Sequence, residues 1–208
     1  MKIDPRRWNL TGGIWGIVGV AALAVVLALA IMMIPRAEVA ARVNGERITA
    51  EDVEEMQARY GISHDQALDH LITKTILLQE ATKGGYLPTL EDAEFELHTQ
   101  LAAVNMTRED LDLQLELYGI SYEEYLEGYR TDLAIQNYLE AAVEVPEVTE
   151  EEVEALYDYY RQIVPEDQLP PLEEIEEFLI AELEQQKHEE AISALIDELK
   201  EKARIKYG

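Results

Sequence analysis

The chain has 208 residues, of which 43 are acidic and 17 are basic, and its formal net charge is -26. This length is enough for one or two domains that each bury a hydrophobic core. The sequence has no cysteine, which excludes disulfides, thiolate metal sites and a cysteine nucleophile, and its negative charge disfavours binding to a nucleic-acid backbone.

A membrane-spanning helix is the first predicted element. The run from Ile14 to Ile34 contains no charged residue. At about 1.5 Å per residue, a helix of this length crosses the hydrocarbon core of a bilayer, which is about 30 Å thick. We therefore predict a single-pass signal anchor at residues 13–35, preceded by an N-terminal tail at residues 1–12.

Basic residues give the expected orientation of this anchor. Three precede the apolar run and two follow it closely, namely Lys2, Arg6 and Arg7, then Arg36 and Arg42. Because cytoplasmic flanks of membrane helices are enriched in basic residues, we expect the tail in the cytoplasm and residues 37–208 outside the cell membrane. A cleaved signal peptide is the alternative. Its apolar region is usually shorter, about 7–15 residues, but residues 38–41 offer small side chains for cleavage.

Acidic residues dominate the rest of the chain, residues 37–208. All but one of the 43 acidic residues and all but four of the 17 basic residues lie there, which gives this segment a net charge of -29. One interpretation of this charge is solubility or adaptation to salt, and the other is attraction of basic partners.

Two short strands and three helices are expected after the anchor. Asn44-Gly45 is the pair most favoured in a type I′ hairpin turn, because both residues tolerate a positive φ. Helix N-caps follow at Thr49, Ser63 and Thr89. The second of these helices ends at Gly84-Gly85, and its wide apolar face predicts that it forms the centre of the core.

Residues 105–130, NMTREDLDLQLELYGISYEEYLEGYR, contain two further helix starts. Each start is marked by a capping pair, Thr107 with Asp110 and Ser121 with Glu124. The first helix is short and ends at Gly119, and the second is long, so we expect a tight corner between them.

Tyrosines gather around this corner. The chain has 11 tyrosines against two phenylalanines, and four of the tyrosines lie within residues 118–129. Tyrosine combines a large apolar body with a polar tip, which suits an adaptable groove for extended or unfolded peptide. Core tyrosines whose hydroxyls reach water are the alternative. The candidate peptide-binding residues are Tyr118, Tyr122, Tyr125, Leu126 and Tyr129.

The C-terminal part is predicted to be helical up to a final strand. Val145-Pro146 breaks the long helix, Thr149 with Glu152 opens another, and RQIVPEDQLPP with its three prolines is expected to be a linker. Residues 172–202 form one long acidic helix that packs back on the preceding helices. Residues 203–207 are predicted to form a strand that pairs with the N-terminal hairpin. Residues 37–208 are then one mainly α domain with a small sheet.

The sequence contains no recognisable pattern of catalytic or metal-binding residues. Its four histidines are not spaced as in zinc motifs, and it has no GxSxG, phosphate-binding loop or dinucleotide-binding glycine motif. Acidic runs such as Glu150-Glu151-Glu152 follow helix caps, where carboxylates interact favourably with the helix dipole. We therefore expect a protein that is not an enzyme and has no cofactor and no metal.

The order of these motifs resembles the N-terminal chaperone domain of SurA/PpiD/PrsA-like proteins. The resemblance rests on VAARVNGERITAEDV, ALDHLITKTILLQEATKGGY, the stretch at residues 105–130, VTEEEVEALYDYY and LIDELKEKARIKYG. It spans nearly all of residues 38–208. Members of this family often carry a parvulin-type prolyl isomerase domain before the last helix, whereas here only the proline-containing linker stands in that place.

This resemblance implies a membrane-anchored extracytoplasmic chaperone that binds unfolded or nascent secreted and membrane proteins without ATP. Its partners would be unfolded polypeptides and the membrane. The alternative is an accessory or structural subunit of a membrane complex that uses the same domain for one fixed partner. A peptidyl-prolyl isomerase is less expected, because the resemblance does not extend to the parvulin domain.

Overall fold

The computed structural model describes residues 38–165 and 168–208. The predicted tail at residues 1–12 and the predicted anchor at residues 13–35 lie outside these residues. In the part of the chain that is described, no helix is both long and apolar enough to cross a membrane. The anchor therefore stays a prediction.

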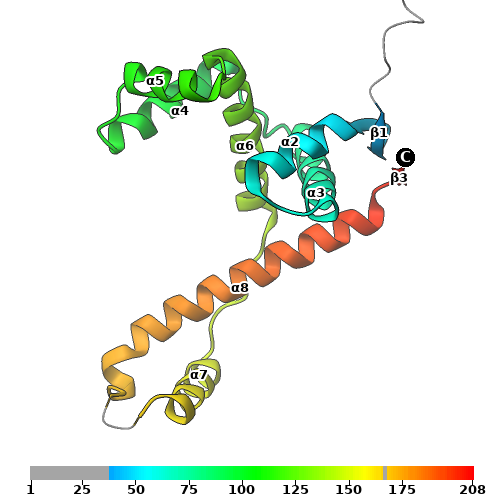
Figure 1. The fold of residues 1–208 in the computed structure, drawn as a ribbon. Helices are drawn as coiled ribbons and strands as arrows, with labels where there is room; N and C mark the ends of the chain where they lie inside the picture. Colours follow the sequence, from blue (N-terminus) through cyan, green and yellow to red (C-terminus); the bar gives the residue numbers. More distant parts are fainter. Residues whose placement is uncertain (1–37, 166–167) are drawn as a thin grey trace, which may run out of the picture. The chain divides into compact units, whose positions relative to one another are not determined.

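The described chain contains seven helices and three short strands (Figure 1). In chain order they are β1 Val39–Val43, β2 Glu46–Thr49, α2 Ala50–Tyr60, α3 His64–Lys83, α4 Leu90–Ala103, α5 Arg108–Tyr118, α6 Tyr122–Ala142, α7 Glu150–Ile163, α8 Leu172–Lys202 and β3 Ile205–Tyr207. Each helix of the described residues except α8 begins at a Ser or Thr whose side chain accepts a hydrogen bond from the backbone N–H three residues on. The predicted fold class, mainly α with a small sheet, is confirmed.

The sheet joins the two ends of the compact unit Val39–Gly208. Its strand order is β2-β1-β3, and both pairs are antiparallel. Asn44 and Gly45 have φ values of 53° and 102°, which confirms the type I′ turn. Asn44 also fixes the turn in place, because its Oδ1 accepts a hydrogen bond from Arg204 N at 2.8 Å and its Nδ2 donates to Gln79 Oε1 at 2.8 Å.

A first hydrophobic core, here called the sheet cluster, lies between the sheet, α2, α3 and the C-terminal end of α8. Its buried members are Ala41, Val43, Ile48, Val53, Ala67, Ile72, Ile76, Leu77 and Leu199. Four of these residues belong to α3, which also packs against α6. The prediction that this helix forms the centre of the core is confirmed.

A second core, here called the corner cluster, lies between α4, α5 and the N-terminal half of α6. Its buried members are Ala93, Leu97, Leu101, Leu111, Leu115 and Leu126. Helix α6 links the two clusters, because its later residues Ile135, Tyr138 and Leu139 pack against the sheet cluster. The N-terminal half of α6 therefore belongs to the corner cluster, and its C-terminal half packs on the sheet cluster.

Helix α7 packs against the N-terminal half of α8, and α8 then returns to α3. Val153 and Leu179 are the buried residues of α7 and of this half of α8, with 5% and 0% of their surface exposed. Lys187 Nζ of α8 donates to Glu152 Oε2 of α7 at 2.7 Å. At the far end of α8, Lys200 Nζ donates to Asp69 Oδ1 of α3 at 2.7 Å.

Three local features differ from the sequence-based expectation. Helix α7 continues to Ile163, so the start of the predicted linker is helical. Strand β3 begins at Ile205 rather than at residue 203, because Ala203 N–H still bonds to the Leu199 carbonyl at the end of α8. The Ser121 hydroxyl accepts from Glu124 N at 3.2 Å, but among the described contacts Glu124 returns no bond to Ser121 N, so this capping box is half formed.

Candidate functional site

The predicted corner between α5 and α6 is built on Gly119. This residue ends α5 with a φ of 68°, a conformation that residues with a side chain adopt only with strain. Its N–H bonds to the Glu116 carbonyl at 3.1 Å, and Ile120 N–H bonds to the Leu115 carbonyl at 3.1 Å. The corner thereby brings the end of α5 and the start of α6 together beside α4.

The five candidate residues of this corner lie in three environments. Tyr118, the last residue of α5, is 78% exposed. Tyr122, Tyr125 and Tyr129 on α6 are half-buried and pack against the corner cluster, whereas Leu126 is a buried member of it. Among the five, Tyr118 alone offers most of its surface to a partner.

Tyr122 is held by charged side chains of two other helices. The Arg108 guanidinium of α5 lies over its ring, 3.0 Å from the ring centroid, and the Tyr122 hydroxyl donates to Glu94 Oε1 of α4 at 3.1 Å. Burial, followed by the hydrogen bond to the Glu94 carboxylate, raises the pKa of Tyr122 above its ordinary value. This residue therefore fastens α4, α5 and α6 to one another.

Tyr129 lies deeper along the same face of α6. Its hydroxyl oxygen is buried and has no hydrogen-bond partner in the described chain. Burial, followed by the nearby Glu96 carboxylate and Tyr125, raises the pKa of Tyr129. The half-buried tyrosines thus contribute to the packing of the corner as well as to its surface.

Exposed apolar side chains that the sequence analysis did not single out lie on the outward side of α5. Leu113 and Leu117 are 64% and 84% exposed, and the exposed Tyr118 follows Leu117 as the last residue of the helix. Leu111 and Leu115 of the same helix point into the corner cluster, so α5 has apolar residues on both sides. We call Leu113, Leu117 and Tyr118 the outer face of α5. The signal was present in the sequence, since the alternating leucines of LDLQLEL cannot all lie on one side of a helix.

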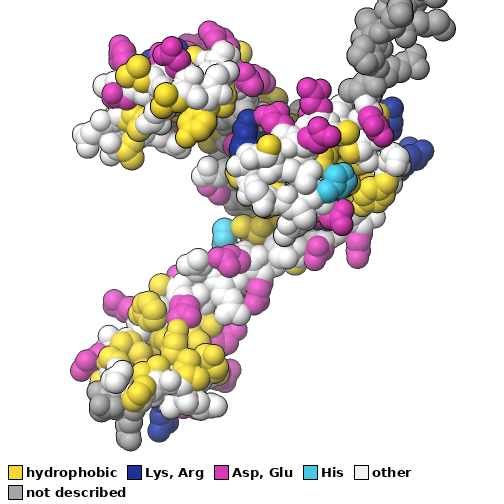
Figure 2. Space-filling view, in the orientation of Figure 1, with side chains coloured by type: hydrophobic (Ala, Val, Ile, Leu, Met, Phe, Trp, Pro, Cys, Tyr) yellow, Lys and Arg dark blue, Asp and Glu magenta, His cyan; other side chains and the backbone are white. Residues whose placement is uncertain are grey.

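Carboxylates border this outer face. Glu109 and Glu116 stand about one turn from Leu113 on either side, both are exposed, and neither has an ion pair among the described residues. The basic residue of α5, Arg108, bonds to Asp112 at 2.9 Å. Figure 2 shows apolar and acidic side chains side by side over α4 and α5. The face therefore offers apolar contact area within a region of negative potential.

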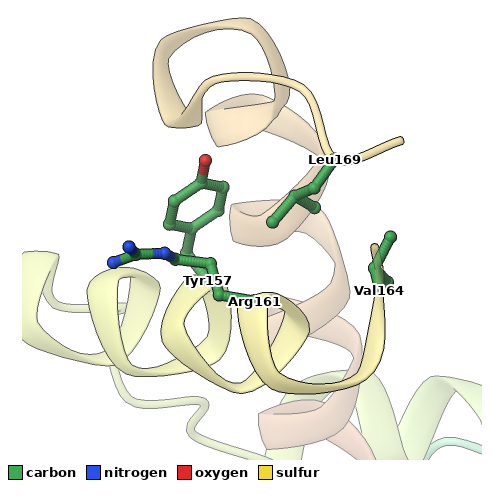
Figure 3. Close-up of a pocket in the computed structure, with 4 residues that line it drawn as sticks. All are labelled: Tyr157, Arg161, Val164 and Leu169. Carbon is green, nitrogen blue, oxygen red and sulfur yellow. The ribbon is translucent and has the colours of Figure 1, made fainter. Parts of the chain in front are cut away.

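A small hollow of about 370 Å³ lies at the end of α7 (Figure 3). Tyr157 and Arg161 of α7 line it together with Val164 and Leu169 of the linker. The Tyr157 hydroxyl donates to the Pro170 carbonyl at 3.0 Å, and Arg161 pairs with Asp158 at 3.3 Å. The first bond ties the linker to α7, and together the two bonds engage both polar side chains of the hollow.

Among residues 38–165 and 168–208, no three His, Asp or Glu side chains are grouped so that they could hold a metal ion. The described core likewise contains no buried polar or charged residue. What the geometry offers is contact surface, with apolar side chains at the corner and carboxylates around them.

Comparison with known proteins places this fold among those of SurA-like chaperones. One solved structure matches with a TM-score of 0.60. It comes from work on the virulence factor PEB4 and the periplasmic protein Cj1289, which are two structurally related SurA-like chaperones of the human pathogen Campylobacter jejuni. The match covers 82% of this chain and 98% of the other, at 13% sequence identity. No family model and no curated protein sequence matches the chain. The resemblance inferred from the motifs therefore holds at the level of the fold.

Proposed function

We propose that the protein is a membrane-anchored, extracytoplasmic chaperone that binds unfolded or nascent secreted and membrane proteins without ATP. The observation that carries this proposal is the outer face of α5, where three large apolar side chains are exposed on a SurA-like fold. Exposed apolar patches bordered by polar residues are typical of protein-binding surfaces.

The surroundings of this face suit a binder of many different sequences. Leucine and tyrosine side chains on an open helix surface make contacts that depend on apolar area rather than on one fixed geometry. The carboxylates around them keep the exposed patch soluble and repel other copies of the chain. Tyr122, Tyr125 and Tyr129 of α6 pack against the corner cluster and are half-buried, so they offer part of their surface to a partner, whereas Leu126 is a buried member of that cluster.

The N-terminal sequence supports the proposed attachment to the membrane. An uncharged run at residues 14–34 and three basic residues before it favour a signal anchor with residues 37–208 on the far side of the membrane from the cytoplasm. An anchored chaperone would meet polypeptides as they emerge from the membrane. Prolyl isomerase activity is not part of the proposal, because α7 and α8 are joined only by residues 164–171, a linker too short for a catalytic domain.

The test uses the full chain in lipid nanodiscs and a chemically denatured model enzyme, citrate synthase, whose aggregation is followed by light scattering. We expect suppression at a near-stoichiometric ratio. Tyr118→Ala should weaken it several-fold, because a well-placed aromatic contact contributes about 1 kcal/mol or more to binding. If the wild type suppresses aggregation and Tyr118→Ala suppresses it equally well, the outer face of α5 is not the client-binding surface.

Tyr60→Ala is the matched control. Tyr60 is 63% exposed and ends α2 just before Gly61, as Tyr118 ends α5 just before Gly119. This substitution removes the same side chain from the same position in a helix, so it should leave suppression unchanged. If the wild type suppresses no aggregation at any salt concentration, and one membrane complex co-purifies with it in fixed ratio, the protein is an accessory subunit instead.

A further inference from the structure

A second candidate binding surface is a groove between α4 and α6. The groove is open to solvent and has a volume of about 490 Å³. Pro88, Phe95 and Leu133 form its apolar part, and Phe95 is 74% exposed. A large aromatic ring at the edge of a groove offers a stacking surface for an arginine or for another apolar side chain.

The charges of the groove are uncompensated. Asp92, Glu96 and Glu140 line it, and the described lining residues include no lysine or arginine. Asp92 accepts from the Thr89 hydroxyl at 2.6 Å and Glu140 from Gln136 Nε2 at 2.9 Å, while Glu96 has no hydrogen bond or ion pair in the described chain. Carboxylates that line the same groove reinforce one another's negative potential, so a cation that enters is attracted by all three.

Amide side chains add the means to hold a main chain. Gln100 of α4 and Asn137 of α6 both line the groove, and neither makes a hydrogen bond within the described chain. A free amide group can accept from a peptide N–H and donate to a peptide carbonyl at the same time. The groove therefore combines an apolar wall, free main-chain partners and a negative potential.

We propose that this groove binds an extended segment of a client polypeptide in which arginine or lysine stands next to an apolar residue. The apolar side chain packs on Phe95 and Leu133, and the cation lies between Glu96 and Glu140. The class of ligand rests on the proposed function, whereas the preference for basic segments rests on the groove itself. Such segments would be held at two places, by the outer face of α5 and by the groove.

The experiment measures binding of a short fluorescent peptide, in which arginine alternates with leucine, to the full chain in nanodiscs by fluorescence anisotropy. A second peptide has citrulline in place of arginine and so lacks only the charge. We expect the arginine peptide to bind about tenfold more tightly than the citrulline peptide, and Glu96→Gln with Glu140→Gln to remove about that factor. Phe95→Ala should weaken the binding of both peptides.

Glu173→Gln with Glu176→Gln on α8 is the matched control, because both residues are exposed and the change in net charge is the same. This pair should change the affinity for the arginine peptide less than twofold. Equal weakening by both pairs of substitutions would overturn the proposal and leave only general attraction by an acidic protein. No weakening by the groove pair would overturn it as well.

Suppression of citrate synthase aggregation, measured on the same samples, separates this inference from the proposed function. Suppression together with an unselective groove would reject the inference and keep the chaperone function. Selective peptide binding without suppression would reject the chaperone function and keep the groove as a site for basic segments.

Discussion

The sheet cluster and the corner cluster are both built from capped helices with apolar stripes, yet they differ in how completely other elements cover them. The sheet cluster gathers residues from both ends of the described chain, from Ala41 to Leu199, and is covered by a sheet and several helices. The corner cluster draws only on consecutive helices, from Ala93 to Leu126, and large apolar side chains stay exposed around it. A core becomes closed when enough elements cover each helix, and the corner has too few.

This difference has a consequence for dynamics. Contacts between consecutive helices form and break locally, whereas a sheet that joins distant parts of the chain must open as a whole. We expect the corner to open at lower free energy than the sheet cluster. An adaptable client-binding surface on a stable base is the functional counterpart of this arrangement.

The largest effect should come from the sheet cluster. Ile76 of α3 is 4% exposed, and Ile76→Ala should lower the free energy of unfolding by about 2–5 kcal/mol through lost burial and a cavity. Urea unfolding followed by circular dichroism measures this loss. Ile163→Ala is the control, since Ile163 is 57% exposed and its substitution should change stability by no more than about 0.5 kcal/mol. If Ile76→Ala and Ile163→Ala lowered the free energy of unfolding equally, Ile76 would not belong to the core.

Two leucines of α5 sharpen the comparison within the corner. Leu115 is 6% exposed and Leu117 is 84% exposed. Leu115→Ala should destabilise the corner by about 2–4 kcal/mol, seen as faster hydrogen exchange in α4 and α5. Leu117→Ala should leave exchange unchanged and weaken suppression of client aggregation. The reverse pattern would show that the outer face is structural and not a binding surface.

Two glycines test whether the corner opens independently. Gly119 and Gly61 have φ values of 68° and 66°, and an added Cβ would meet no atom within 4 Å at either position. Alanine should therefore destabilise each site by about 1 kcal/mol through backbone strain alone. Hydrogen exchange should rise in α5 and at the start of α6 for Gly119→Ala, and α3 should stay protected. A uniform rise over both clusters would mean that they open as one unit.

The smallest effect concerns the contacts of Tyr122 with Arg108 and Glu94, here called the polar bracket of the corner. Burial and the Glu94 carboxylate raise the pKa of Tyr122, so Glu94→Gln should lower that pKa, which NMR titration of the ring carbon next to the hydroxyl detects. Because the folded pKa is raised, the bracket's contribution to stability is complete below the unfolded pKa and is lost as pH rises through the folded pKa. An unchanged pKa in the variant would remove Glu94 from the bracket.

Local order was determined by the sequence. Ser and Thr caps predicted where six helices begin, Asn44-Gly45 predicted the hairpin turn, and Gly119 predicted the end of α5. These signals act over four residues or fewer, because a cap or a turn is satisfied by its immediate neighbours. The same local reading missed that α7 runs past Arg161, since nothing in its own turn requires the helix to stop there.

Which apolar residues are covered was decided only by the tertiary structure. Leu126 is buried in the corner cluster and Tyr122 is half-buried under Arg108, whereas Tyr118, from the same tyrosine-rich stretch, is exposed. Leu113 and Leu117 are exposed because no other helix of the described residues packs on the outer side of α5, and the groove beside Phe95 exists only because α4 meets α6. Burial is a property of neighbours brought together from elsewhere in the chain, and periodicity alone contains no information about them.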